Sequence, residues 1–312
     1  MVFNNTVVNL HYVNDPVWME RAFLLLKKHY QLVSVQQIDG YYHNNTPLRN
    51  SCHVTFDDGD DSFYRVVFPI IKKHQIPVSI YVSPKATIER DSFWFQKFKA
   101  TDKEALKKVL LKDVKFAPVT SEIGGFPAIV LCKCMEIAKL NRVIDQCLEK
   151  NKNHSVVAKN MSIAQLLEVE DSGLVEIGAH TMNHPILSNE SDADAEWEIS
   201  SSITELSKLL GKTINYFAFP NGRYGLDFGD RELELISRNG IRLAFSTERK
   251  SFSKRDNPLL VPRKGLSHGR NAMILAKLIL GKNWDSLKKV MQGRDETDLR
   301  IMLNKILAGT EK

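Results

Sequence analysis

The sequence has few cysteines, no long hydrophobic run and no recognisable leader segment. Only four of its 312 residues are cysteine, and none forms the Cys-x-x-Cys pair typical of zinc-binding or redox motifs. We therefore expect buried, reduced thiols rather than a disulfide framework. The longest apolar candidate, residues 273–280, spans only eight residues, whereas a membrane-spanning helix needs about 18. The sequence thus predicts no transmembrane segment.

The N-terminus lacks a basic stretch followed by a long apolar run, because a strand-like segment already begins near Thr6. We therefore expect no signal peptide and a cytoplasmic location. The net charge of +6 comes from 43 basic and 37 acidic residues. This mild excess suits contact with phosphates or an anionic surface, and equally suits simple solubility. We expect no nucleic-acid partner. The basic segment 274–289 could contact a membrane peripherally, although a packing helix with a solvated lysine face also explains it.

Hydrophobic residues make up 43% of the chain and charged residues 26%, which excludes a disordered, collagen-like or coiled-coil protein. Strand-like and helix-like segments alternate along most of it, which is typical of parallel α/β proteins. The expected strands are residues 6–10, 52–56, 77–82, 174–178, 214–219, 243–246 and 259–261. The expected helices are residues 17–30, 63–73, 162–171, 192–210 and 231–239. This alternation predicts an α/β fold, a distorted or incomplete (β/α) barrel.

The alternation is interrupted between residues 87 and 159, where an aromatic cluster, a lysine-rich stretch and helix-like segments follow one another. We interpret this stretch as a mainly helical insertion within one barrel that spans residues 1–312. A separate compact domain is the alternative. Residues 271–312 are expected to form a helical C-terminal tail. The length alone would suggest about two domains, but the motifs described next need residues from both ends of one barrel.

Residues 55–59, Thr-Phe-Asp-Asp-Gly, place Asp57 and Asp58 directly after a predicted strand. Like charges this close raise each other's pKa, and a cation would relieve them. Gly59 allows the chain to bend, so both carboxylates could face one site. An Asx turn or a helix cap is the structural alternative.

Residues 180–185, His-Thr-Met-Asn-His-Pro, follow another predicted strand. Histidines at positions i and i+4 can face one metal ion, and zinc-like ions favour imidazole nitrogen together with a carboxylate. Such a pair also arises by chance. Both motifs lie at the carboxyl ends of predicted barrel strands, where barrel enzymes carry their active sites.

Together the two motifs resemble those of the NodB-homology polysaccharide deacetylases, carbohydrate esterase family 4. The order along the chain is also similar, because a strand with a Pro-x-Gly loop follows at Pro220, Asn221 and Gly222. The resemblance covers about residues 9 to 263 and is interrupted by the insertion. It implies metal-dependent hydrolysis of the N-acetyl amide of an amino sugar, in a polysaccharide or glycan precursor, with release of acetate.

The resemblance also implies roles for individual residues. Asp57 would be the catalytic base, and the loop at residues 220–222 would contact substrate and supply a backbone N–H, that of Asn221, to the oxyanion. The ligands of a divalent metal, most readily zinc with cobalt or nickel as alternatives, would be Asp58, His180 and His184.

The sequence departs from many family members at Ala218, where they carry an arginine. The N-terminal segment around His11 looks like the strand of a rearranged branch that includes deacetylases of poly-N-acetylglucosamine. In that branch the general-acid histidine comes from the first strand, which implies His11 here, with His268 as a minor rival. Arg263, in a Val-Pro-Arg segment, would then orient Asp57 in place of the missing arginine. A packing role for His11 and a surface ion pair for Arg263 are the alternatives.

Other interpretations stay open at this stage. Ala218 also fits a saccharide-binding protein that has lost catalysis, and the expected location fits a deacylase of a lipid-linked or nucleotide-linked sugar. Five aromatic residues could stack on sugar rings, although most aromatic side chains belong to hydrophobic cores. They are Trp18, Tyr64, Phe93, Trp94 and Tyr224. The sequence identifies neither the sugar nor the oligomeric state.

Overall fold

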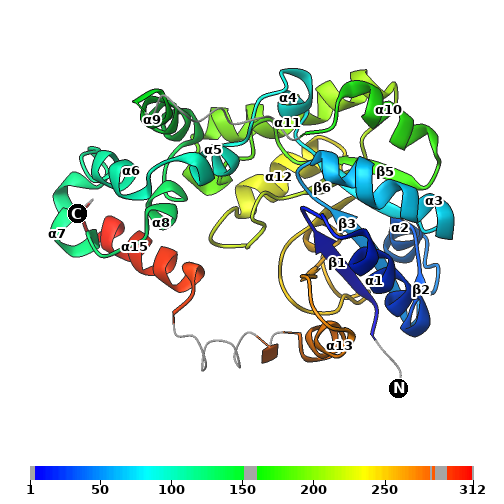
Figure 1. Ribbon diagram of the computed structural model, residues 1–312. Coiled ribbons are helices and arrows are strands. Elements are labelled where there is room, and N and C mark those ends of the chain that lie inside the picture. The colour runs from blue at the N-terminus through cyan, green and yellow to red at the C-terminus, as the bar shows by residue number, and fades with distance from the viewer. Residues whose placement is uncertain (1–3, 151–159, 282, 285–293, 311–312) are drawn as a thin grey trace.

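The computed structural model describes residues 4–150, 160–281, 283–284 and 294–310, and its centre is a parallel sheet (Figure 1). The strands follow the order β7-β6-β5-β4-β3-β1-β8, with β2 beside β3. They are β1 (Thr6–Leu10), β2 (Gln31–Leu32), β3 (Ser51–Phe56), β4 (Val78–Val82), β5 (Val175–Ala179), β6 (Tyr216–Ala218), β7 (Leu243–Phe245) and β8 (Lys264–Gly265). The predicted α/β fold, a distorted (β/α) barrel, is confirmed.

The two ends of the sheet are linked through the segment that precedes β8. Val261 forms a parallel bridge with Phe245 of β7, and Lys264 pairs with Val8 of β1. The strand predicted at residues 259–261 is wrong, because a single turn of 3-10 helix, η4 (Pro258–Leu260), occupies most of that range. Pro258 fixes a helical φ and has no N–H to donate to a strand.

Side chains of β3 alternate between two hydrophobic environments, as they must in a strand. Cys52, Val54 and Phe56 belong to the large cluster beneath the surrounding helices. The residues between them face the opposite side, where His53 bonds to the Val33 carbonyl. The acidic motif, Asp57, Asp58 and Gly59, follows directly after the last residue of β3.

Helices cover the outer face of the sheet. They are α1 (Pro16–His29), the π-helical turn η1 (Phe63–Val67), α3 (Phe68–His74), α10 (Ile163–Asp171), α11 (Asp192–Leu210) and α12 (Asp230–Arg238). Helix α2 (Val35–His43) instead belongs to the cluster on the opposite side of the sheet, where Val35 and Ile38 join Val7 of β1. Asp15 caps α1 through a 2.9 Å bond from the Trp18 N–H, and Gly211 ends α11 with φ +64°. Helix α2 was not predicted, although Ser34 and Gln37 form the capping box that marks its start.

The described part of the interrupting segment is helical and has its own hydrophobic cluster. After α4 (Pro84–Ile88), it contains α5 (Trp94–Ala100), α6 (Lys103–Leu110), η2 (Ala117–Val119), α7 (Thr120–Ile123), α8 (Ala128–Cys132) and α9 (Ile137–Lys150). Helix α15 (Glu296–Thr310) lies against these helices and adds Leu303 and Leu307 to their cluster (Figure 1). The end of the expected insertion, residues 151–159, lies outside the described residues.

Helix α13 (Asn271–Leu280) packs near α1, at the bottom of the view in Figure 1, whereas α15 lies at the left. Most of the remaining basic segment expected up to residue 289 lies outside the described residues. All four cysteines are free and buried, as predicted. Among the described helices, none is long and apolar enough to span a membrane.

Candidate active site

The two adjacent carboxylates after β3 are brought to one side by an unusual backbone. Asp58 has φ +74° and Gly59 has φ +72°. A left-handed conformation is costly for a residue with a side chain and persists only where the surroundings enforce it. A Cβ on Gly59 would also meet a methyl group of Val82 at 3.3 Å. This bend after β3 brings Asp57 and Asp58 to the contacts described next.

Arg263 binds both oxygens of Asp57. Its Nη1 and Nη2 atoms lie 2.7 and 2.8 Å from the two carboxylate oxygens, and both side chains are buried. Nη1 also donates to the hydroxyl of Thr55, at 3.1 Å. Burial alone would raise the pKa of Asp57, but the charge and hydrogen bonds of Arg263, together with the nearby His180 and His11, hold the pKa below its usual value. The alternative of a surface ion pair is thereby excluded for Arg263.

His11 lies beside the same carboxylate. Its Nε2 is 3.8 Å from an oxygen of Asp57, and its side chain is 54% exposed. The backbone fixes this neighbourhood, because the N–H of Asp57 donates to the carbonyl of Leu10 at 3.0 Å. A packing role does not fit a side chain that is half exposed next to a buried carboxylate. His268, in contrast, pairs with Asp15 at 3.1 Å.

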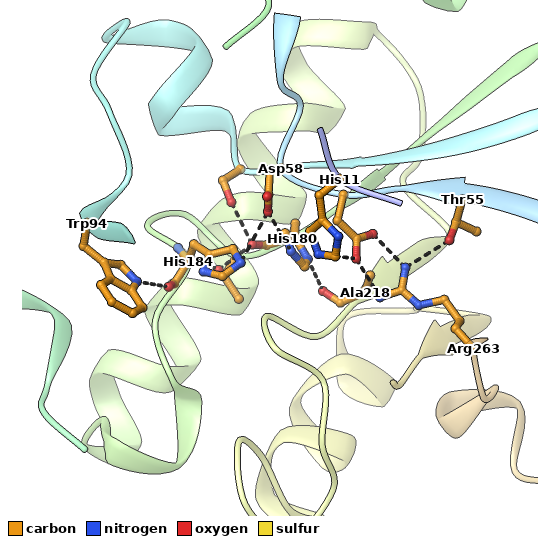
Figure 2. Close-up of polar contacts among 11 residues, drawn as sticks. His11, Thr55, Asp58, Trp94, His180, His184, Ala218 and Arg263 are labelled. Atoms are coloured by element: carbon orange, nitrogen blue, oxygen red, sulfur yellow. Dashed lines mark hydrogen bonds and ion pairs between the residues drawn. The ribbon is translucent and has the colours of Figure 1, made fainter. Parts of the chain in front are cut away.

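Asp58, His180 and His184 form one buried group of potential metal ligands. One ligand atom from each lies within 4.8 Å of the others. The Nε2 atoms of the two histidines are 3.6 and 3.4 Å from one oxygen of Asp58, longer than ordinary hydrogen bonds. Figure 2 shows the ligand histidines between Trp94 and Arg263.

The protonation states of these three groups suit a cation. The Nδ1 of His180 lies 2.6 Å from the carbonyl of Ala218; a carbonyl only accepts, so Nδ1 carries the hydrogen and Nε2 keeps its lone pair towards Asp58. Burial lowers the pKa of His184. Burial alone would raise the pKa of Asp58, but the facing histidines hold it well below its usual value. One oxygen of Asp58 is buried without a hydrogen-bond partner, which a bound cation would supply.

A carboxylate from α11, which the sequence did not indicate, fixes the loop between the two histidines. The oxygens of Glu198 accept from the N–H groups of Met182 and Asn183, both at 2.9 Å, and from the side-chain amide of Asn183 at 2.6 Å. His184 itself has φ +58°. We interpret Glu198 as a positioning residue that keeps this loop in its strained form. In the sequence Glu198 is one of several carboxylates along the predicted helix 192–210, so no local signal could have identified it.

The helical segment also touches the histidine pair. The indole N–H of Trp94 donates to the carbonyl of His184 at 3.1 Å (Figure 2). The ring of Phe95 lies 5.0 Å from the imidazole of His184, centroid to centroid. Trp94, Phe93 and Trp18 are buried, so none of these three is available to stack on a sugar. Tyr224 stays partly exposed, and Tyr64 donates to Glu168 at 2.5 Å.

The predicted Pro-x-Gly loop follows β6, the strand next to the one that carries His180. Asn221 has φ +56° and Gly222 has φ +74°. A Cβ on Gly222 would lie 2.9 Å from a methyl carbon of Thr247, so the loop needs glycine there. The N–H of Gly222 donates to the carbonyl of Pro220 at 2.6 Å, which leaves the N–H of Asn221 as the candidate oxyanion donor.

Comparisons with known proteins agree with this geometry. Residues 141–243 match the family described as polysaccharide deacetylase. The predicted family resemblance is confirmed. The matched region contains both histidines and the loop at residues 220–222, while the acidic motif lies outside it. The match indicates a carbohydrate deacetylase, a hydrolase. A comparison with curated protein sequences finds no match.

Several solved structures share the fold. The deacetylase PplD of Streptococcus pyogenes, solved in complex with acetate, has a TM-score of 0.59 at 18% identity, over 89% of this chain and 99% of that chain. IcaB of Ammonifex degensii has a TM-score of 0.61 at 18% identity, over 88% and 97%. The BpsB deacetylase domain of Bordetella bronchiseptica has a TM-score of 0.54 at 17% identity, over 85% and 96%. At these identities the likeness shows the fold alone.

Proposed function

We propose that this protein is a metal-dependent deacetylase that hydrolyses the N-acetyl amide of an amino sugar, in a polysaccharide or glycan precursor, and releases acetate. The observation that carries the proposal is the meeting of two groups of residues. Asp57, a buried carboxylate bound by Arg263, directly precedes Asp58, which belongs to the ligand group with His180 and His184. His11 lies beside Asp57. A titratable base, a metal site and an acid at one sheet edge are the parts that amide hydrolysis needs.

The metal would be held by the carboxylate of Asp58 and the Nε2 atoms of His180 and His184. A divalent ion supplies Lewis-acid chemistry, because it polarises a carbonyl group and lowers the pKa of water. Zinc suits two imidazoles and a carboxylate, and cobalt or nickel suit them as well. Three protein ligands leave room for reactants, as catalytic sites require.

The chain's own residues would carry the protons. Asp57, held ionised by Arg263, accepts a proton from the attacking water as the hydroxide adds to the acetyl carbon. The N–H of Asn221 stabilises the negative charge that develops on the acetyl oxygen. His11 then donates a proton to the sugar nitrogen as the C–N bond breaks, so acetate and a free amine leave.

Ala218 motivated the alternative of a saccharide-binding protein without catalysis. Arg263 weakens that alternative, because it supplies from another segment the guanidinium that position 218 lacks, and both oxygens of Asp57 are bound to it. A lipid-linked or nucleotide-linked sugar is the alternative substrate, and the acetate assay on the three substrate classes separates these carriers from a polymer.

The test is acetate release, measured by mass spectrometry, from N-acetylated oligosaccharides, lipid-linked sugars and nucleotide-linked sugars. We expect the zinc-loaded protein to release acetate from at least one class. Removing the metal with a chelator, or introducing Asp57→Asn, should reduce the rate by at least about 1,000-fold. Asp61→Asn is the matched control, since Asp61 pairs with Arg65 on the surface.

Activity that survives full chelation would contradict the metal-dependent mechanism. A folded, metal-loaded protein that binds saccharides but releases no acetate from any substrate would instead favour the binding protein.

A further inference from the structure

A cavity of about 390 Å³ lies directly beside His11, between the loop after β1 and the loop after β8. Both loops leave neighbouring strands at the carboxyl edge of the sheet, because β8 pairs with β1. The residues that line the cavity are Leu10, His11, Tyr12, Val13, Asn14, Asp15, Trp18, Leu266, Ser267 and His268. None of them belongs to the metal-ligand group, and His11 is the residue that the cavity shares with the candidate active site.

The proposed reaction orients its substrate relative to this cavity. The acetyl oxygen must point to the metal ligands, whereas the sugar nitrogen must reach His11 to receive its proton. The ring that carries the nitrogen therefore lies on the His11 side of the reacting amide. The cavity is lined by His11 itself, and its volume falls in the range of small-molecule sites.

The lining matches the chemistry of a sugar ring. Leu10, Val13 and Leu266 are buried and form apolar parts of the wall, which suit the C–H faces of a ring. Tyr12 is 53% exposed and offers an aromatic face together with a hydroxyl group. The polar groups of Asn14 and Ser267 suit ring hydroxyls.

The wall is also held in place. His268 stacks on Trp18 with ring centroids 5.2 Å apart, and its Nε2 lies 3.1 Å from Asp15. The indole N–H of Trp18 donates to the carbonyl of Gly269 at 3.2 Å. These contacts tie the loop after β8 to the start of α1, so the imidazole of His268 is oriented before a ligand arrives.

We propose that this cavity binds the sugar ring whose amide is hydrolysed, with Tyr12 and His268 as its specificity-determining side chains. The inference rests on the proposed function for the direction of the substrate. It assigns His268 to sugar binding instead of proton transfer.

The test measures binding without turnover. Metal is removed from the full-length protein with a chelator, and the dissociation constants of N-acetylglucosamine and its tetramer are measured by saturation-transfer NMR and calorimetry. We expect Tyr12→Ala and His268→Ala each to weaken binding by about tenfold. Trp197→Ala is the matched control, because Trp197 is 49% exposed on α11 and lies outside the cavity lining; it should bind as the wild type does.

Binding that is unchanged in both cavity variants, or equally weakened in Trp197→Ala, would overturn the proposal, as would the absence of saccharide binding to the folded wild type. The result is separate from the acetate assay. A protein that binds sugar through Tyr12 and His268 but never releases acetate would keep the subsite and refute the deacetylase. Thermal unfolding of each variant confirms that the fold is intact.

Discussion

Arg263 and Asp57, which are 206 residues apart in the sequence, form a two-point ion pair in which both side chains are buried. Their meeting depends on the barrel, because Asp57 follows β3 and Arg263 precedes β8, and both strands pair with β1. The pair fixes the carboxylate and keeps it ionised. Arg263 thus provides beside Asp57 a guanidinium group that Ala218 cannot provide.

Arg263→Gln should lower kcat/KM by about 100-fold, because the carboxylate of Asp57 loses its orientation. The charge of Arg263 holds the pKa of Asp57 low, so removing it raises that pKa. The acidic limb of the pH profile should therefore shift to higher pH, since the base must be deprotonated. Breaking the buried pair should also cost about 3–5 kcal/mol in unfolding free energy.

Arg263→Lys, which keeps the charge, should retain more of the low-pH activity than Arg263→Gln. Arg65→Gln removes an exposed pair with Asp61 and should change stability by less than about 1 kcal/mol. An acidic limb at the same pH in wild type and Arg263→Gln would contradict this role of the arginine.

Zinc should raise the Tm of the wild type by about 5 °C at a free concentration 100 times the dissociation constant, because only the folded chain assembles the ligands. Asp58→Asn and His184→Gln should lose most of this increase. His74→Gln is the matched control, since His74 pairs with Glu20 away from the site. Calorimetric titration gives the stoichiometry, which we expect to be one ion per chain. An undiminished increase in the two ligand variants would place the metal elsewhere.

Glu198→Gln should weaken zinc binding by about tenfold, because the amide group cannot accept all three of the hydrogen bonds that hold the loop at Met182 and Asn183. The measurement is competition with a chromophoric chelator. Glu205→Gln on the same helix removes an exposed carboxylate and should leave the affinity unchanged. Equal affinities in wild type and Glu198→Gln would show that Glu198 is only structural.

The free energy of unfolding should fall in mild acid because the buried His53 resists protonation in the folded chain. Its imidazole is fully buried against the Val33 carbonyl and the Ser79 hydroxyl, and burial lowers its pKa from 6.5 to about 4. Between these values the unfolded chain binds a proton that the folded chain does not, so stability falls as the pH drops. The loss reaches about 3 kcal/mol near pH 4.

Denaturant unfolding at pH 4.5, 5.5 and 7.5 measures this effect. His53→Gln can still donate to the Val33 carbonyl but cannot be protonated, so its stability should depend less steeply on pH than that of the wild type. The same slope for both proteins would assign the acid sensitivity to other groups.

Much of the barrel could be predicted from local patterns. The run at β1, the cap of α1 at Asp15 and the glycine that ends α11 are each specified by neighbouring residues, and the structure places them where the sequence did. The strand expected at residues 259–261 is wrong because Pro258 begins a turn of 3-10 helix there and only Val261 bridges to Phe245 of β7. Strand ends depend on partners, whereas helix caps depend on adjacent residues.

For the candidate site, too, some features follow from local sequence and others only from the tertiary structure. The sequence by itself determined which side chains could serve, because Asp57, Asp58, His180 and His184 occur in motifs whose chemistry can be read from their order. Only the tertiary structure decided that Arg263 reaches Asp57, that Glu198 fixes the histidine loop and that Trp94 bonds to it. These contacts join residues from separate elements, and such contacts form only when the sheet brings the ends of its strands to one edge.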